Sequence, residues 1–515
     1  ISAQDPTVEW IHNYDGPLAT FDEAMVGALH PAGENLVVAG KGWDTEGGQN
    51  VFIIRYTTDG DTLWTYTWDG PESKDDTPYD LAITPNGIIY VCGQTRTGDG
   101  YWDSDAFLLA LDSDGNLLWE DVYGTLGVYL DIYYELRVAY DEGVFVAGQE
   151  NIGENAADVG LMQRYNSSGD VTWSVHYDVS SVYPYTDTFR ALEVDSEANA
   201  IMGGAVTNAG TDYDWITVSY AESTGNQNWA MSNPGNLSGV AESVYDLITG
   251  DANDVYALGQ NSMGLYEVVK YDVDGIFQWS YELEGFSIYS MQGNDYMHVD
   301  YEGNLYFAVT GNADIVVTKL DPDGNQVWQQ VWNGPMNLND EVWQMTSDFF
   351  GNLYIAGRSG FSNNYYDMIM LSYDPDGNLL WDVNFDGPAT NNDEAHGIVV
   401  SPYGNNIYLL GYARGFITSN ADLTVVKYSQ VTPVVETTPS ELILFPNPTS
   451  EQCQLQWNGT GPCVLRVYGG NGELVIEREV RGSSHLLDVS NLSDGIYNIV
   501  IIGKGSTFSD RLVVE

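Results

Sequence analysis

The apolar positions of the first 430 residues fall into short runs separated by glycine, asparagine and aspartate. One class of run ends in glycine, as in NLVVAG at 35–40 and NLYIAG at 352–357. A second class lies downstream, as in VFIIRY at 51–56 and DMIMLSY at 367–373. These runs are rich in β-branched and aromatic residues, which favour strands. A shorter run precedes each pair and another follows it, so the pattern predicts repeats of four antiparallel strands.

A tryptophan marks the fourth run of each repeat. From the first to the last of these tryptophans is 371 residues over seven intervals, a mean spacing of about 53 residues. Units of four strands with a period of roughly this length are typical of propeller blades. The tryptophans are Trp10, Trp64, Trp119, Trp173, Trp229, Trp279, Trp328 and Trp381. We expect each of them to wedge between neighbouring blades.

The two ends of the array complement each other. The last repeat begins at Asp393 and stops after its third run, VVKYSQ, whereas the chain start, TVEWIHNYDGP, contains only a fourth run. We therefore predict an all-β fold, an eight-bladed β-propeller over residues 1–430, in which residues 1–21 complete the last blade. Strands from both ends would close the ring, and closure removes unpaired sheet edges.

The stretch DPDGNLLW at 374–381, with close copies at 321–328 and 112–119, raises the question of a calcium loop. A calcium-binding hand loop needs glycine at its sixth position and a bidentate acid at its twelfth. Here glycine is fourth, and the twelfth residue counted from Asp112 is Tyr123. Proline second and glycine fourth suit a hairpin turn with a left-handed glycine. The stretch predicts a turn.

Residues 431–440, VTPVVETTPS, are rich in proline and threonine and predict a linker. Residues 441–515 read as a small β-sandwich with a hairpin turn at 470–472. Cys92 is expected to be a buried small apolar residue. Cys453 and Cys463 are either a bridge between adjacent strands, as in an exported protein, or free thiols.

The tail resembles the C-terminal sorting domain of type IX secretion cargo from Bacteroidota-like bacteria. The resemblance covers 441–515 and rests on FPNP, GELV, LDVSNLSDGIYNIVI and a final apolar strand. The matching positions are Phe445, Pro446, Asn447, Pro448, Leu487, Asp488, Leu492, Gly495, Ile496 and Tyr497. The family usually ends rich in lysine, whereas this chain has Arg511 in SDRLVVE. The resemblance implies recognition by the type IX translocon and then surface attachment or release. The initial ISAQ, with the small Ala3, is similar to the end of a Sec signal.

The array itself is similar to bacterial SBBP-type repeats. Their pattern has an acidic residue at the first strand, G-N-x-Y-x-x-G in the second, aspartate before the third, and D-x-D-G-N-x-x-W. It recurs over 1–430. This resemblance implies a propeller and implies no chemistry.

The net charge is −57, from 17 basic and 74 acidic residues. That sign excludes nucleic acid as a natural partner, because phosphates need basic surfaces. No run reaches the roughly 18 apolar residues of a membrane span, so membrane insertion is not expected. Either the charge serves solubility in salt, or clustered carboxylates bind divalent cations.

Catalytic motifs are missing from the sequence. The six histidines fall at different places in different repeats, and no G-x-S-x-G elbow, Walker loop or zinc-binding cysteine set occurs. Quinone-dependent propeller enzymes have similar D-G-W turns but usually carry adjacent cysteines and a buried Glu/Asn/Asp calcium set. This chain has no adjacent cysteines. We therefore expect no enzymatic activity and no catalytic residues.

Acidic residues recur at two places in the repeats. One set opens the third strands and comprises Asp105, Asp158, Asp214, Glu267, Asp314, Asp367 and Asp422, with Asn50 in the first repeat. A second set opens first strands at Asp22, Asp75, Asp340 and Asp393. Either each carboxylate accepts backbone N–H bonds from a neighbouring loop, or the six third-strand aspartates form a calcium-binding rim. Ca²⁺ is the only cofactor that the sequence suggests.

The loops expected on the same face carry aromatic residues. They are Trp43, Tyr101, Trp102, Tyr213, Trp215, Phe361, Tyr365 and Tyr366. Exposed aromatics on rigid loops stack on sugars or contact partners. The alternative is that they cover blade edges. The sequence thus predicts a non-enzymatic surface or matrix protein that binds glycans or surface proteins through this face, or else a subunit of an extracellular homopolymeric filament or sheath.

Overall fold

The computed structural model describes residues 5–514 except for short stretches. The stretches left out are 17, 19, 31–34, 44, 46, 99, 101–102, 125–129, 152–157, 178–186, 208–212, 234–241, 251, 291–294, 301, 363–364, 390, 403, 416–419, 431–441, 450–451, 458–461, 469–473, 491, 494 and 504–505. Every regular element among the described residues is a strand. That part of the chain contains no helix suited to crossing a membrane.

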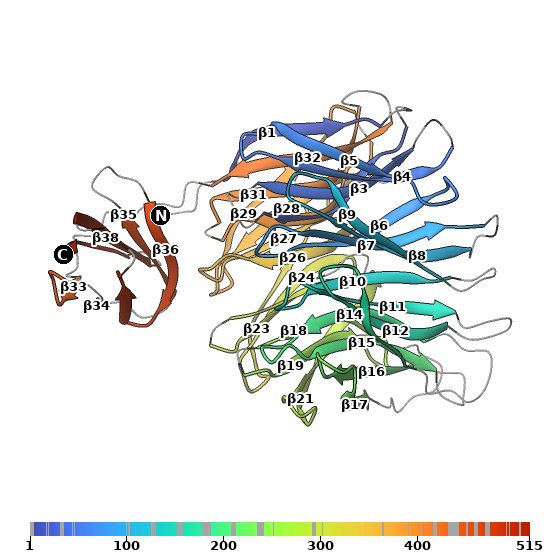
Figure 1. Cartoon of the computed structure of the whole chain (residues 1–515). Coiled ribbons are helices and arrows are strands. Elements are labelled where there is room, and N and C mark those ends of the chain that lie inside the picture. The colour runs from blue at the N-terminus through green and yellow to red at the C-terminus, as the bar shows by residue number, and fades with distance from the viewer. Residues whose placement is uncertain are drawn as a thin grey trace.

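The larger part of the molecule repeats a four-stranded antiparallel sheet, as predicted, and the sheets are arranged like the blades of a propeller (Figure 1). The first two sheets are β2 (Glu23–Leu29), β3 (Leu36–Trp43), β4 (Gln49–Tyr56), β5 (Thr62–Trp68) and β6 (Asp76–Ile83), β7 (Ile89–Arg96), β8 (Ser104–Leu111), β9 (Leu117–Tyr123). The next two are β10 (Ile132–Val138), β11 (Val144–Asn151), β12 (Asp158–Tyr165), β13 (Val171–Tyr177) and β14 (Thr188–Val194), β15 (Ala200–Thr207), β16 (Tyr213–Tyr220), β17 (Gln227–Asn233).

Two further repeats share one sheet, because the long β21 pairs with β20 and then with β23. This sheet comprises β18 (Ser243–Thr249), β19 (Val255–Gln260), β20 (Leu265–Tyr271), β21 (Phe277–Ser290), β22 (Met297–Val299), β23 (Leu305–Gly311), β24 (Asp314–Leu320) and β25 (Gln326–Trp332). It is followed by β26 (Asp340–Ser347), β27 (Leu353–Ser362), β28 (Tyr365–Tyr373) and β29 (Leu379–Phe385).

One sheet combines strands from both ends of the repeat array. It contains β30 (Glu394–Val400), β31 (Asn406–Arg414), β32 (Ala421–Ser429) and the N-terminal β1 (Thr7–Tyr14). Strand β1 pairs antiparallel with β32, from Thr7 opposite Ser429 to Tyr14 opposite Leu423. We call this sheet the composite sheet, and the contact between two neighbouring sheets a seam.

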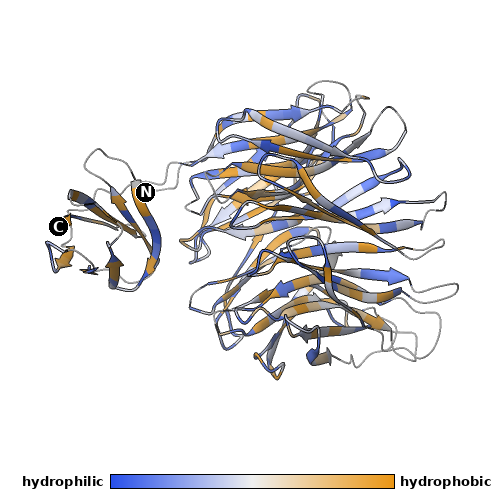
Figure 2. Ribbon diagram, in the orientation of Figure 1, coloured by the Kyte–Doolittle hydropathy of each residue, from blue (hydrophilic) through white to orange (hydrophobic). Residues whose placement is uncertain are grey.

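Burial follows strand position within each sheet. Second and third strands are almost continuously buried, as in β3 and β4, whereas fourth strands alternate, as in β5. Figure 2 shows apolar residues concentrated in the middle of the sheets. First strands carry a β-bulge, for example between Pro78 and Asp80 and between Tyr133 and Glu135. A bulge re-aims the following side chain, which here places polar groups between first strands.

The repeat tryptophans join each sheet to the next, which agrees with the predicted wedge. Trp64 of β5 donates its indole N–H to the carbonyl oxygen of Ser113, in the turn between β8 and β9, at 3.0 Å. A Cβ on Gly115 of that turn would lie 2.6 Å from the Trp64 ring, so only glycine (φ +82°) fits there. The same N–H bond runs from Trp10, Trp119, Trp173, Trp229, Trp279 and Trp328 to the turns that contain Thr58, Ser167, Glu222, Val273, Pro322 and Pro375.

The D-x-D-G turns are hairpin turns, as predicted. Asp112 uses Oδ1 to accept the backbone N–H groups of Asp114 and Asn116, both at 2.9 Å. The same bonds form at Asp321 and Asp374. These aspartates cap their own turns.

The smaller part of the molecule, drawn in red in Figure 1, is also entirely β. Its strands form two sheets: β33 (Ile443–Phe445), β34 (Gln452–Gln456), β37 (Ser484–Asp488), and β36 (Leu474–Arg481), β35 (Pro462–Tyr468), β38 (Gly495–Gly503), β39 (Ser506–Val514). Cys453 and Cys463 are buried in its core as free thiols, so the disulfide does not form, and Cys92 is buried as expected. The predicted linker at 431–440 and the turn at 470–472 lie outside the described residues.

Trp381 offers the sharpest test of the tryptophan contacts, because its side chain is only 2% exposed and its N–H reaches Gln430 Oε1 at 3.1 Å. We expect Trp381→Ala to lower the free energy of unfolding by about 3–5 kcal/mol, as for other large core truncations. Trp381→Phe should cost less, since it keeps most of the apolar contact. Guanidinium denaturation measures both, and an alanine variant as stable as the parent protein would contradict the role.

Candidate functional site

First-strand aspartates fasten the loops between sheets. Asp393 accepts the backbone N–H of Gly387 at 2.6 Å and that of Arg414 at 2.8 Å. The equivalent glycine bonds are Gly16 to Asp22, Gly70 to Asp76 and Gly334 to Asp340, at 2.6–2.8 Å. These aspartates therefore accept backbone N–H bonds from neighbouring loops, which is the first of the two roles that the sequence suggested. In the second sheet the buried residue is Asp76 and not Asp75, because Asp75 lies one residue earlier and pairs with Arg96.

The third-strand aspartates do not form a single metal-binding rim. Each lies in a different sheet, on β8, β12, β16, β24, β28 or β32, and Asp158 is also out of register. Asp367 lies opposite Ser359 of β27. Asp158 lies opposite Asn151 of β11, so it does not occupy the equivalent position in its sheet. Asp105, Asp214, Asp314 and Asp422 share the register of Asp367. Of the six, only Asp367 joins a group of three potential metal ligands within the described residues.

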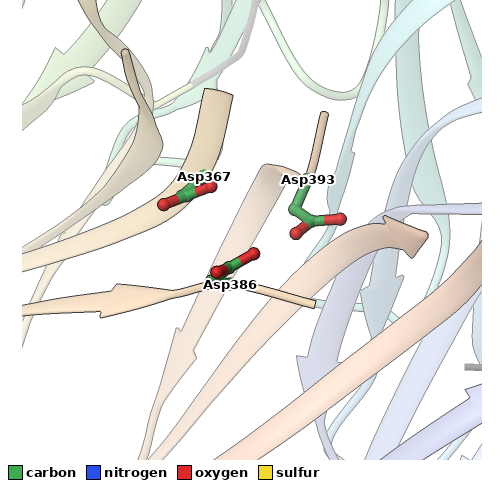
Figure 3. Close-up of side chains that lie close together, drawn as sticks. All are labelled: Asp367, Asp386 and Asp393. Carbon is green, nitrogen blue, oxygen red and sulfur yellow. The ribbon is translucent and has the colours of Figure 1, made fainter. Parts of the chain in front are cut away.

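That group consists of Asp367, Asp386 and Asp393, which we call the acid triad (Figure 3). One carboxylate oxygen from each residue lies within 4.8 Å of the others. Asp367 belongs to β28, Asp386 follows β29, and Asp393 precedes β30, so the triad sits on the seam between two sheets. Asp367 and Asp393 are buried and Asp386 is exposed. Figure 3 shows the three carboxylates facing a common space.

Like charges dominate the electrostatics of the triad. Burial raises the pKa of Asp393 to about 7, and the charges of Asp367 and Asp386 add to this rise against the two backbone N–H bonds. Burial likewise raises the pKa of Asp367, opposed by the hydrogen bond from Asn384 Nδ2 at 2.8 Å. No triad carboxylate has an ion-pair partner among the residues that the structure describes.

At the next seam the corresponding positions are Asp422 on β32 and Asp15 and Asp22 between β1 and β2, but these three do not form a group of potential metal ligands within 4.8 Å of one another. Burial raises the pKa of Asp22 to about 6, and the charges of Asp15 and Asp422 add to it. The Oδ1 atoms of Asp15 and Asp22 are buried without a hydrogen-bond partner. Asp386 and Asp15 were missed by sequence reasoning. Their signal is the motif D-G-P at 386–388 and 15–17, seven residues before the first-strand aspartate.

Charged side chains beside these aspartates form a chain across the same two seams. Arg358 of β27 binds Glu341 of β26 and Glu394 of β30, each at 2.9 Å. His396 of β30 lies between Glu394 and Glu23 of β2, and Glu23 pairs with Lys41 of β3. Burial lowers the pKa of His396, which is packed against the Trp343 ring. The chain connects three consecutive sheets through ion pairs on either side of the His396 ring.

A second charged cluster lies among the first strands. Arg137 of β10 contacts Asp80, Glu135, Glu193 and Asp295 at 3.2–3.7 Å. The carboxylates also fasten neighbouring first strands: Leu136 N donates to Asp80 and Leu192 N donates to Glu135, at 2.9 and 2.6 Å. Sequence reasoning missed this cluster. Its signal is that Asp80 and Glu135 each lie four residues after the acidic residue at the start of the first strand, Asp76 or Asp131.

The predicted aromatic surface is only partly present. Trp215 is fully buried against Val244 and Leu247, so it is a core residue and its expected role as an exposed loop aromatic is wrong. Trp43 is half-buried at the end of β3, and Tyr101 and Trp102 lie outside the described residues. Tyr365 and Phe361 are exposed on the β27–β28 hairpin. Tyr366 lies under the Arg358 guanidinium, 4.4 Å from its ring centroid.

The histidines of the repeats lie at separate places. His298 is half-buried, hydrogen bonds to Ser347 at 3.0 Å, and has a pKa lowered to about 4 by desolvation. His176 pairs with Glu150 at 2.6 Å, and this hydrogen bond raises the histidine pKa. Tyr123 donates to the same carboxylate at 2.7 Å. The His298 contact joins β22 to β26, and the Glu150 contacts join β11 to β13 and to β9.

The tail motif residues have structural roles. Asn447 of FPNP donates from Nδ2 to the Arg511 carbonyl at 2.7 Å and accepts the Val513 N–H at 2.9 Å, which fixes the loop to β39. The Tyr497 hydroxyl donates to the Ser493 carbonyl, and Asp488 accepts the backbone N–H and hydroxyl of Ser490. The side chain of Phe445 is exposed.

Comparisons with known families agree with the two-part organisation. Residues 443–515 match the secretion system C-terminal sorting domain, so the chain is exported by type IX secretion to the cell surface or extracellular space. Residues 214–429 match the model described as outer membrane protein assembly factor BamB, which supports a propeller-like fold. No curated protein matches the sequence.

Solved structures are similar only at low identity. A fungal alcohol oxidase of the AA5 family in complex with copper has 12% identity and a TM-score of 0.44, with 99% of this chain and 100% of that chain covered. A quinohemoprotein alcohol dehydrogenase from Comamonas testosteroni has 12% identity and a TM-score of 0.47, with 87% and 79% covered. The β-propeller domain of the Trilobed protease from Pyrococcus furiosus has 8% identity and a TM-score of 0.39, with 70% and 96% covered. Such distant likeness says nothing about activity.

The charged cluster around Arg137 predicts a stability that depends on pH. Burial raises the pKa of Asp246 to about 8, with a further rise from the charge of Asp295, and burial raises the pKa of Asp80 to about 6. Both folded-state pKa values exceed the usual value of about 4, so the folded chain binds more protons than the unfolded chain. The contribution of these two groups to the free energy of unfolding is fully present below about pH 4 and is lost as pH rises through 6 to 8.

We therefore expect the melting temperature in EDTA to fall between pH 6 and pH 9, and Asp246→Asn to reduce the fall. The amide keeps an acceptor for the Tyr296 N–H, which donates to Asp246 at 2.7 Å. Asp382→Asn, far from this cluster in the fourth strand β29, is the control. A melting temperature that is flat or rises with pH would contradict the prediction.

Proposed function

We propose that this exported protein is a non-enzymatic binding or adhesion protein of the cell surface or extracellular matrix, built on a closed eight-bladed propeller of SBBP-type repeats. The series of tryptophan contacts supports this ring. It includes Trp10 of the N-terminal β1, whose N–H reaches Thr58 in the turn after β4 at 3.0 Å. The composite sheet thereby contacts the first sheet through the same bond that joins the other neighbours, as closure by both chain ends requires.

The exposed aromatic hairpin β27–β28 carries the functional proposal. Phe361 and Tyr365 are 42% and 38% exposed, although both are large apolar side chains. The hairpin is held firmly, because the carbonyl oxygen of Tyr366 accepts the Asp393 N–H at 2.8 Å and Arg358 packs over the Tyr366 ring. A rigid surface with two aromatic rings suits stacking on the apolar faces of sugars or on a partner protein.

A glycan array tests this proposal directly. The parent protein should bind a defined group of glycans, and Phe361→Ala with Tyr365→Ala should reduce that binding at least about tenfold, since each lost aromatic contact is worth about 1 kcal/mol or more. Tyr140→Ala is the matched control. Tyr140 is the most exposed tyrosine of the described residues, but lies in the β10–β11 turn, at the opposite end of the antiparallel strands. Binding that survives the double substitution would contradict the sugar-binding hairpin.

A second function, a subunit of an extracellular filament or sheath, is favoured by the outer strands. Fourth strands expose large apolar side chains in most repeats. They include Val8 and Ile11 of β1, Leu63 of β5, Leu118 of β9, Val171 of β13, Phe277 of β21, Val327 and Val331 of β25, and Leu379 of β29. Apolar edge strands are the usual place for sheet-to-sheet association.

Electron microscopy of the protein taken from the cell surface separates the two functions. A structural subunit should appear in ordered filaments or sheets, and Leu118→Lys with Val327→Lys should disperse them, because buried lysines are costly at an interface. Particles that remain single rings at every concentration would contradict the filament function and would be consistent with the binding function.

A further inference from the structure

We propose that Arg190 and the tyrosines beside it form a binding site for the C-terminal carboxylate of a peptide that ends in an apolar residue. Arg190 belongs to the first strand β14, and its side chain is exposed. Strand β14 lies beside the first strands of the two neighbouring sheets, β10 and β18 (Figure 1). The site is separate from the β27–β28 hairpin, so the inference goes beyond the binding surface proposed above.

The β-bulges of three consecutive first strands place these side chains. Arg190 stands at the bulge of β14, between Phe189 and Ala191, where the register to β15 shifts. Tyr134 has the same position in β10, and Tyr245 has it in β18. A bulged residue is left out of the regular pairing, and its side chain is re-aimed. Here the two tyrosine side chains are half-buried and the arginine side chain reaches solvent.

The positive charge of Arg190 lies between two tyrosine rings and pairs with no carboxylate of the described residues. Its guanidinium carbon is 5.1 Å from the centroid of the Tyr134 ring, which is a cation–π contact. Burial raises the pKa of Tyr134 and of Tyr245, and the charge of Arg190 opposes the rise at both hydroxyls. The chain has 17 basic residues against 74 acidic ones. An arginine that pairs with none of the described carboxylates is therefore free to bind an anion from outside.

The hydroxyl groups of the two flanking tyrosines already have partners within the protein. Tyr134 donates its hydroxyl to Gln149 Oε1 at 3.2 Å, and Tyr245 donates to Gln260 Oε1 at 3.1 Å. These bonds hold the rings in place, and Tyr79 packs against Tyr134 with ring centroids 5.6 Å apart. The site thus offers one guanidinium group together with aromatic ring surface.

This combination of groups selects among anions. A guanidinium binds a carboxylate through two parallel N–H···O bonds. A carboxylated sugar needs further donors and acceptors for its hydroxyl groups, whereas aromatic rings suit an apolar side chain. An apolar residue that ends in a carboxylate matches both features of the site. Capture of a C-terminal carboxylate is one of the recurring modes of peptide recognition.

The acidic surroundings restrict which peptides can bind. Arg137, three residues after Tyr134 on β10, contacts Asp80 of β6 and Glu193 of β14, so carboxylates lie on that side of the site. These carboxylates and the net charge of −57 repel a peptide that carries acidic side chains. A peptide whose single carboxylate is at its end can pair with Arg190 and adds the least repulsion.

Binding of the whole chain to a library of synthetic pentapeptides tests the proposal, with each peptide present both as the free C-terminal acid and as the C-terminal amide. We expect free acids with an apolar last residue to bind, and their amides to bind at least about tenfold more weakly. Arg190→Gln should remove the preference for the acid, and Arg190→Lys should weaken it, because an ammonium group lacks the planar fork. Arg478→Gln is the matched control, since it removes an exposed arginine from β36 and should bind as the parent protein does.

The melting temperature of Arg190→Gln should equal that of the parent protein, because the side chain is exposed, and this separates a lost contact from a lost fold. Phe361→Ala with Tyr365→Ala should leave peptide binding unchanged, so the site and the hairpin are tested independently. No peptide binding at millimolar concentration, amides that bind as well as acids, or an unchanged preference in Arg190→Gln would overturn the proposal. Equal binding of isovalerate or of uronate oligosaccharides, with the same dependence on Arg190, would overturn the assignment to a peptide.

Discussion

The hydrogen bond from a fourth-strand indole to the turn of the next sheet is the interaction on which the larger part of the molecule depends. Its distance is 2.7–3.1 Å across the series, and each indole lies against a turn glycine that no other residue could replace. The bond couples two features of one repeat, since the turn that receives an indole is followed at once by the strand that supplies the next. Misplacing one turn would therefore disturb two seams.

Basic residues are scarce in this chain, and two lysines lie at the contact between an indole and a turn. Lys427 and Lys319 donate to the turn carbonyls of Thr58 and Pro375, the same oxygens that accept the Trp10 and Trp328 indoles. Arg137 and Arg358 lie among carboxylates from several sheets. With 17 basic residues against 74 acidic ones, most carboxylates must remain in water.

The fold was predictable because the repeat motifs encode it locally. The tryptophan period, the D-x-D-G turns and the glycine-ended second strands each specify a piece of backbone, and all appear as expected. The candidate site was less accessible, because it combines residues from a third strand, an inter-sheet loop and the next first strand. Asp158 shows the difficulty: it resembles Asp367 in sequence, but Tyr165 of its strand aligns with Tyr373, which places Val159 at the aspartate position.

Trp215 illustrates a second limit. It follows Asp214 at the start of β16, and a tryptophan near a loop in an acidic protein looks like a binding residue. The strand alternation turns it inward, where Gly259 of the next sheet leaves room for the large ring: a Cβ there would lie 2.9 Å from Trp215 Cζ3. The exposure of the Trp215 side chain thus depends on the residue across the seam, and the sequence alone does not tell which residue lies there.

The composite sheet concentrates these constraints. Its seams with the neighbouring sheets carry the contacts from Glu341 to Lys41, and the acid triad lies at one of these seams. Loop-closure entropy explains why polar contacts accumulate there: joining strands from opposite ends of a long chain costs more than joining strands in a hairpin. A repeat array can tolerate a weak seam between consecutive sheets, because the chain itself keeps them adjacent. The sheet that unites the two ends has no such connection between β1 and β32, so the backbone pairing of these strands and the side-chain interactions around them must hold it.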